Sequence, residues 1–181
     1  IEAIDEPHVK IICNEKKLQN QENLCVKAAG LLRKLYRIPF GFCIRLKKRI
    51  PVGAGLGGGS SNAAMTLLGI RSLLRLNLGQ RRLYDLGGIL GSDVNFFLSQ
   101  NPFAFIQGRG EKVVGIPGKR LFHLVIWPGE HLSTKEVYAA RSLELTKFFD
   151  NIKIIKYALK KGDITLLKKS LFNACLLYTS D

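Results

Sequence analysis

Residues 51–64 read Pro51-Val52-Gly53-Ala54-Gly55-Leu56-Gly57-Gly58-Gly59-Ser60-Ser61-Asn62-Ala63-Ala64. Five glycines within seven positions are followed by two serines and then by a helix-forming segment. Glycine adopts positive φ readily and lets the backbone approach a ligand, so that successive N–H groups can converge on one point. A helix that follows adds the positive end of its dipole and its unpaired N–H groups. The stretch therefore predicts a loop that binds phosphate groups.

The segment after the glycines has the apolar pattern of a helix. Ala63, Leu67, Ile70 and Leu74 fall on one helical face, which predicts a helix over 63–76. Its N-cap is expected among the hydroxyl and amide side chains of residues 60–62. A flexible glycine-serine linker would instead lie between polar segments. We therefore interpret the glycine-rich stretch as a binding loop rather than as a flexible turn.

Ser60 and Ser61 have two possible roles at the end of this loop. Their hydroxyls can cap the helix, or they can bind a phosphate or join the ligand shell of Mg²⁺. Both interpretations stay open on the sequence alone.

Three other nucleotide-binding loops do not fit. A Walker A loop ends in Gly-Lys-Ser/Thr, and no lysine follows Gly59. The spacing of Gly53, Gly55 and Gly58 matches the dinucleotide fingerprint, but residues 69–80 lack the acidic residue that binds the ribose. The catalytic loop and the Asp-Phe-Gly triplet of protein kinases are also absent.

The composition predicts a basic globular protein. The chain has 181 residues, 46% of them hydrophobic, and a net charge of +14. This charge raises the alternative of nucleic-acid binding. However, the basic residues are scattered along the chain and are not interleaved with aromatic residues. We therefore expect an anionic small-molecule substrate and no nucleic-acid partner.

The sequence favours neither a metal site nor a membrane partner. Cys13, Cys25, Cys43 and Cys175 lack the spacing of a zinc site or of a disulfide framework, and the three histidines are isolated. No apolar run reaches the roughly 20 residues of a membrane span, and no signal peptide is recognisable. We therefore expect a cytoplasmic protein.

Periodicity predicts a mixture of helices and strands. Strands are expected over 9–13, 42–46, 103–107 and 121–127, the second with Cys43 and Arg45 facing outward. Helices are expected over 22–36 and around 83–90, and then over 134–142, 149–161 and 163–172. In the first helix, Leu24, Ala28, Leu31, Leu32 and Leu35 are expected on the buried face. Because strands and helices do not alternate strictly in this order, the pattern predicts an α+β fold.

The glycine-rich loop and its flanks resemble the GHMP kinases, and within them the branch of 4-diphosphocytidyl-2-C-methyl-D-erythritol kinases. The matching segments, in chain order, are Asn23-Leu24-x-Val26-Lys27-Ala28-Ala29, Lys48-Arg49-Ile50-Pro51, the loop, Leu90-Gly91-Ser92-Asp93-Val94-x-Phe96-Phe97, Gly108-Arg109-Gly110-Glu111, Pro128-Gly129 and Ser133-Thr134-x-x-Val137-Tyr138. The resemblance covers about residues 20–173, and the triple glycine Gly57-Gly58-Gly59 separates this branch from relatives that carry fewer glycines before the paired serines.

This resemblance implies a GHMP kinase fold, whose N-terminal domain is of the ribosomal protein S5 domain 2-like type. The N-terminal ATP-binding domain is expected over 1–128 and the beginning of a C-terminal domain over 129–181. The implied reaction is ATP- and Mg²⁺-dependent phosphorylation of the 2-hydroxyl of 4-diphosphocytidyl-2-C-methyl-D-erythritol, in non-mevalonate isoprenoid synthesis. The alternatives are another GHMP kinase, for homoserine or mevalonate, and a basic nucleic-acid-binding α+β module.

The resemblance also assigns the site residues. ATP is expected to bind Pro51, Val52, Gly53, Ala54, Gly55, Leu56, Gly57, Gly58, Gly59, Ser60 and Ser61. Asp93 could be a simple helix cap, but it matches the catalytic aspartate of the family's Gly-x-Asp-Val motif. Because a carboxylate is a far weaker base than an alkoxide, we expect Asp93 to orient the hydroxyl and take its proton late, or to act with a cation.

Other singled-out residues are expected to be structural. Arg109 and Glu111 are expected to lie in a hairpin turn as surface charges, with a substrate role for Arg109 as a minor alternative. Trp127 and Tyr138 are expected to pack in the core or on the surface rather than to stack on a base.

Both ends of the chain look cut. In the family, a lysine on a strand upstream of Ile1 supplies the cation, and the cytidine-binding residues lie largely outside this sequence. Residues 174–181 depart from the family pattern and are expected to be a non-native tail. The chain as given is therefore expected to bind nucleotide poorly and to be inactive by itself.

Overall fold

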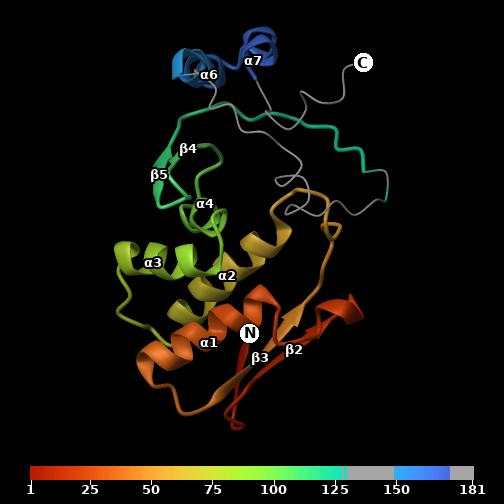
Figure 1. Ribbon diagram of the computed structural model, residues 1–181, viewed down its shortest axis with the longest axis vertical. Coiled ribbons are helices and arrows are strands. Elements are labelled where there is room, and N and C mark those ends of the chain that lie inside the picture. The colour runs from red at the N-terminus through yellow and green to blue at the C-terminus, as the bar shows by residue number, and fades with distance from the viewer. Residues whose placement is uncertain (128, 130–148, 172–181) are drawn as a thin grey trace, which may run out of the picture.

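The computed structural model describes residues 1–127, 129 and 149–171 (Figure 1). Its elements, in chain order, are β1 (Glu2–Ile4), β2 (Val9–Cys13), a 3-10 turn (Lys16–Leu18), α1 (Leu24–Tyr36), β3 (Gly41–Leu46), α2 (Gly58–Leu73), α3 (Gln80–Leu90), α4 (Val94–Leu98), β4 (Ala104–Gln107), β5 (Lys112–Gly115), α6 (Phe149–Lys161) and α7 (Ile164–Ser170). The predicted mixture of helices and strands is confirmed.

A three-stranded sheet forms the base of the molecule. Its order is β1-β3-β2, with β3 antiparallel to β1 and parallel to β2. Helix α1 makes the crossover between the two parallel strands, as parallel pairing requires. Helices α1 and α2 pack against each other on the same side of this sheet (Figure 1). The sheet and the two helices therefore enclose the main core.

Side chains from both layers fill this core. Phe42 of β3, Leu32 of α1 and Leu67 of α2 are all fully buried. The expected apolar face of the helix after the glycines is confirmed, since Ala63 and Ile70 are also fully buried. Burying a large aliphatic or aromatic side chain contributes about 1.5–3 kcal/mol, so these residues hold α1, α2 and the sheet together in one core.

Two details of the expected packing are wrong. Leu35, expected on the buried face of α1, is 39% exposed at the last turn of the helix. Cys43, expected to face outward, is buried. Cys43 lies on the central strand β3. Its cross-strand neighbours are Glu2 of β1 and Lys10 of β2, whose longer side chains flank the small thiol.

A second, smaller cluster joins the C-terminal helices to the hairpin. Ala158, Leu159 and Leu167 of α6 and α7 are buried, and Phe103 and Ile116 pack against them from the two sides of the β4–β5 hairpin. Asp163 caps α7 by accepting a hydrogen bond from the Leu166 N–H. Helices predicted over 149–161 and 163–172 are thus confirmed.

The strand expected over 121–127 is wrong. The segment is extended across the molecule without strand pairing, and Phe122, Leu124 and Ile126 are all more than four-fifths exposed. Its apolar composition favours a strand, but it pairs with none of the strands among the described residues.

Several expectations fall beyond the described part of the chain. The helix over 134–142, Tyr138, and the tail at 174–181 all lie outside it. The domain change near Pro128 also falls at an undescribed residue and stays a prediction. Within the described ranges, no helix combines the length and apolarity that a membrane crossing needs.

Candidate functional site

The glycine-rich loop connects the end of the β3 segment to helix α2. Gly53, Gly55 and Gly57 all have positive φ, at 78°, 70° and 63°. Side chains other than glycine rarely adopt this conformation, which explains why the sequence places glycine at every second position. The alternation turns the backbone repeatedly before the helix begins.

Helix α2 begins earlier than the sequence predicted. Its first residue is Gly58 and its N-cap is Gly57, which has left-handed backbone and no side-chain cap. The expectation that one of residues 60–62 caps the helix is therefore wrong. Three consecutive glycines let the first turn form without a capping side chain, so its N–H groups stay unobstructed.

The two serines consequently lie within the first turn of α2. Ser60 lines the cavity described below, whereas Ser61 does not. The Ser61 hydroxyl donates a hydrogen bond of 3.4 Å to the Gly58 carbonyl. The geometry thus separates the two serines, which the sequence treated as equivalent.

An open cavity of about 710 Å³ lies in front of this loop. It is lined by Leu18, Glu22, Asn23, Leu24, Leu46, Lys48, every residue of the loop from Pro51 to Ser60, Asn62 and Asp93. The structure therefore brings Asp93 to the same cavity as the loop, although more than thirty residues separate them in the sequence. Of the expected ATP-binding residues, Ser61 alone is not among the lining residues.

Asp93 is exposed and precedes helix α4. Its backbone occupies the N-cap position, but its side chain accepts no capping hydrogen bond. The simple capping role considered for Asp93 is therefore not what the structure shows. Val94, the next residue, is fully buried and holds the start of α4 in the core.

Helix α4 also touches the loop directly. A Cβ placed on Gly57 would lie 2.9 Å from Cζ of Phe97, which is closer than real Cβ atoms approach other atoms. Gly57 thus needs glycine for two reasons, its positive φ and the Phe97 ring beneath it. The same short helix therefore contacts the loop and carries Asp93 at its start.

Lys48 is a cavity residue that the sequence analysis did not single out. Its Nζ donates a hydrogen bond of 3.0 Å to Oδ1 of Asn62 in the first turns of α2. Its backbone is fixed by Asn14, which accepts from the Lys48 N–H at 2.6 Å and donates to the Lys48 carbonyl at 3.0 Å. A Cβ on Gly58 would lie 2.7 Å from the lysine Nζ, so the ammonium group lies directly beside the helix start.

The position of Lys48 close to the glycine-rich loop is visible in the sequence. It stands three residues before Pro51, but it was interpreted there as part of a scattered basic surface. Only the contact with Asn62 shows that its positive charge is directed at the loop.

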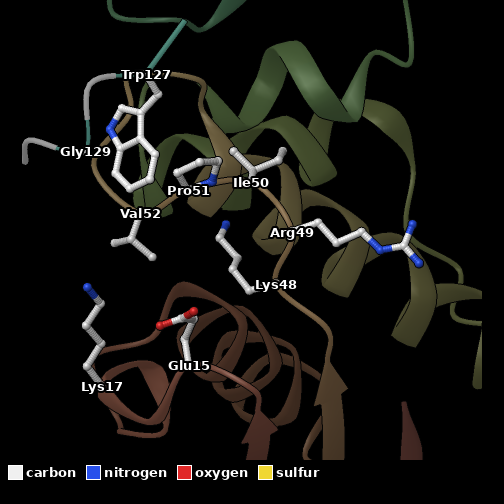
Figure 2. A pocket seen from close by; sticks show the side chains of 9 residues that line it. All are labelled: Glu15, Lys17, Lys48, Arg49, Ile50, Pro51, Val52, Trp127 and Gly129. Carbon is white, nitrogen blue, oxygen red and sulfur yellow. The ribbon is translucent and has the colours of Figure 1, made fainter. Parts of the chain in front are cut away.

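A second pocket of about 350 Å³ adjoins the cavity (Figure 2). The two share Lys48, Pro51 and Val52. Figure 2 shows the indole of Trp127 beside Val52 on one side, with Glu15 and Lys17 on the other. The Arg49 side chain points away from the pocket's centre. Trp127 is 44% exposed, so it is not a core residue and it lies next to the loop.

The turn between β4 and β5 behaves as predicted for Arg109 and Glu111. Both are exposed, and the Glu111 carboxylate accepts a hydrogen bond of 2.6 Å from the Arg109 N–H. Hydrogen bonds from its own backbone N–H and from that of Arg109 hold the pKa of the Glu111 carboxyl below its usual range. The pair therefore stabilises the hairpin turn.

The donor set of the cavity suits a polyphosphate better than a metal ion held by protein alone. Backbone N–H groups of the loop and the ammonium of Lys48 are available to anionic oxygens. Among the described residues, no three histidine, cysteine or acidic side chains gather into a metal-binding cluster. Cys13, Cys25 and Cys43 are free, buried thiols. A divalent cation would therefore have to be held largely by the phosphates, with Asp93 as an acidic neighbour in the same cavity.

Comparison with known proteins agrees with this geometry. Residues 23–108 match the family of the GHMP kinases N terminal domain, a range that includes the loop, Lys48 and Asp93. A 4-diphosphocytidyl-2-C-methyl-D-erythritol kinase of Syntrophus aciditrophicus is 40% identical over 144 residues, which are 79% of this chain and 50% of that protein. One of Clostridioides difficile is 37% identical over 176 residues, which are 96% of this chain and 59% of that protein.

Two solved structures resemble the chain. A crystal structure of 4-(cytidine 5'-diphospho)-2C-methyl-D-erythritol kinase has 31% identity and a TM-score of 0.65, covering 89% of this chain and 57% of the other. Homoserine kinase from Cytophaga hutchinsonii has a TM-score of 0.69 at 16% identity, which shows a shared fold. The chain spans about half to three-fifths of the length of the curated relatives described here. The matched domain, these relatives and the α+β architecture place the chain in the GHMP kinase superfamily.

Proposed function

We propose that this chain forms the ATP-binding part of a kinase that phosphorylates the 2-hydroxyl of 4-diphosphocytidyl-2-C-methyl-D-erythritol. The observation that carries the proposal is the single cavity lined by the glycine-rich loop, Lys48 and Asp93. Phosphoryl transfer needs a cradle for the triphosphate and a group that orients the attacking hydroxyl, and these residues supply both. The substrate is proposed from the relatives' names. A cytoplasmic location in isoprenoid precursor synthesis belongs to the same proposal.

In the proposed mechanism, backbone N–H groups from Gly53 to Ser60 bind the terminal phosphates of ATP. Each donor aimed at charge that develops during transfer can contribute about 3 kcal/mol to the barrier reduction. Lys48 adds a positive charge beside the start of α2. Mg²⁺, bound with ATP, would neutralise phosphate charge when present. Asp93 orients the substrate hydroxyl and accepts its proton as the bond to phosphorus forms.

Trp127 offers a direct test of nucleotide binding. It is the only tryptophan of the chain, and it lines the pocket that shares Val52 with the cavity. MgATP bound at the loop is therefore expected to change the tryptophan fluorescence in a saturable way. Calorimetry on the same samples checks the affinity. Because the chain as given is expected to bind nucleotide poorly, MgATP is titrated to high concentration. Absence of binding there by both measurements would contradict the proposal for this chain.

The substrate is tested on the intact gene product that contains this sequence. ADP release is measured with 4-diphosphocytidyl-2-C-methyl-D-erythritol, homoserine and mevalonate in parallel. We expect turnover with the first alcohol. Turnover with homoserine or mevalonate alone would keep the kinase proposal and overturn its substrate.

Lys48 gives a second prediction about the same cavity. Replacing Lys48 with methionine keeps an unbranched chain and removes the ammonium group beside α2. A hydrogen bond to a charged group contributes about 1.5–3 kcal/mol, so MgATP affinity is expected to fall by roughly 10-fold or more. Calorimetry measures the change. Lys34→Met, at an exposed lysine in the last turn of α1, is the control for loss of one positive charge. Equal affinity of both variants would contradict the role of Lys48.

A further inference from the structure

Helix α4 connects the candidate active site to the β4–β5 hairpin. Asp93 precedes this helix, and Phe97 lies beneath Gly57 of the loop. Figure 1 shows α4 between helix α2 and the hairpin. The residue that faces the hairpin is Asn95, a buried polar side chain that the proposed reaction does not use.

Asn95 is only 1% exposed and links three elements. Its Nδ2 donates a buried hydrogen bond of 3.0 Å to the carbonyl of Gly110 in the hairpin turn. Its Oδ1 has no hydrogen-bond partner among the described residues and lies against Gly87 of α3. A Cβ on Gly87 would overlap this oxygen, so the α3 position must be glycine for the amide to fit. Burying an unpaired amide oxygen costs about 1–3 kcal/mol of stability. This cost accompanies the hydrogen bond between Asn95 and Gly110.

Gly110 lies against the backbone of Ser92, the residue before Asp93. It is buried, it has a φ of 99°, and a Cβ on it would overlap the Ser92 carbonyl oxygen and lie 2.9 Å from its carbon. The hairpin turn therefore contacts the backbone immediately before Asp93. Because the Asp93 side chain makes no capping bond, its position depends on the backbone on either side. Val94 fixes one side by burial, and Gly110 fixes the other.

We propose that the 108–111 turn, held by Asn95, positions Asp93 for the reaction, and that Asn95 and Gly110 are positioning residues. This inference rests on the proposed function. A misplacement of about 1 Å at a catalytic group can cost about 100-fold in rate, so the contact between Gly110 and Ser92 matters although neither residue touches the substrate.

The test compares alanine substitutions at two glycines with positive φ, one inside the turn and one outside it. Gly110→Ala places a methyl group against the Ser92 carbonyl. Gly162→Ala, between α6 and α7, carries the same kind of strain, at a φ of 73°, but its Cβ meets only the Lys119 side chain. In hydrogen exchange of the 181-residue chain, Gly110→Ala is expected to raise exchange of the peptide around 91–95 about 10-fold or more. Gly162→Ala is expected to leave that peptide unchanged.

Kinetics of the intact gene product give the second readout. Gly110→Ala is expected to lower kcat about 100-fold and to change KM for ATP less than about threefold, while Gly162→Ala keeps both values within about twofold. Asn95→Leu, which removes the donor to Gly110 and places an apolar side chain of similar size in the core, is expected to lower kcat in the same way. It keeps the test valid if Gly110→Ala does not fold.

The two experiments test the positioning role of the turn separately from the proposed kinase function. If the exchange of residues 91–95 responds equally to both glycine variants, or to neither, the positioning role is wrong. It is equally wrong if KM for ATP changes as much as kcat. If the wild-type protein does not turn over at all, the proposed function fails, and the exchange experiment still decides whether the turn holds the Asp93 segment.

Discussion

Replacement of Gly57 by valine is expected to abolish MgATP binding. Gly57 has a φ of 63°, which a β-branched residue adopts only with strain, and a Cβ added there would lie 2.9 Å from Cζ of Phe97. The loop must therefore shift, and the N–H groups at the start of α2 move with it. Loss of even two charge-assisted hydrogen bonds, at about 1.5–3 kcal/mol each, weakens binding more than 100-fold. Calorimetry and the fluorescence of Trp127 measure this loss.

The control is the same substitution in helix α1. Gly30 is a helical residue with ordinary φ, and a Cβ placed on it would meet no atom within 4 Å, so Gly30→Val introduces the same side chain at a position with space for its Cβ. It is expected to bind MgATP like the wild type. Far-ultraviolet circular dichroism confirms that both variants keep their fold. Normal binding by Gly57→Val would contradict the phosphate-loop interpretation.

The same variant separates the kinase from the nucleic-acid alternative. If the chain were a basic module for RNA, its binding would depend on salt and on scattered lysines and arginines. Gly57→Val changes no charge and would leave such binding intact. If the wild type and Gly57→Val both bound RNA in a salt-sensitive way and neither bound MgATP, the result would favour the nucleic-acid-binding module.

The sequence predicted most of the regular elements because they follow local patterns. The apolar spacing of α1 and α2 and the strand character of β2 are visible within single windows, whereas the alternation expected for β3 fails because its first four residues are all buried. The loop was also recognisable, since positive φ at alternate positions requires glycine.

What the sequence could not predict depends on residues far apart in the chain. The segment 121–127 has the composition of a strand, but strand formation needs a neighbouring strand, which composition does not report. The start of α2 was misplaced because capping by a side chain is the usual signal, whereas three glycines form the first turn here. The place of Lys48 in the site was not predicted, because it depends on the hydrogen bond to Asn62, fourteen residues later.

The role of Asp93 is the claim with the most specific kinetic consequence. Asp93→Asn keeps the size and shape of the side chain and removes its negative charge, so it cannot accept the proton of the substrate hydroxyl. General base catalysis contributes between about 100-fold and 10,000-fold, and kcat is expected to fall within that range. Because the Asp93 carboxylate makes no hydrogen bond at the start of α4, the substitution is expected to leave the fold unchanged.

Binding and turnover should separate in this variant. The loop and Lys48 are untouched, so MgATP affinity is expected to stay within a few-fold of the wild-type value. Asp85→Asn, at an exposed aspartate of α3 whose carboxylate makes a loose 3.8 Å ion pair with Arg82, is the matched control and should retain normal kcat. An Asp93→Asn protein with wild-type kcat would show that Asp93 does not accept the proton of the hydroxyl. In that event the cavity would still be a nucleotide site, and the group that acts on the hydroxyl would have to come from another part of the protein.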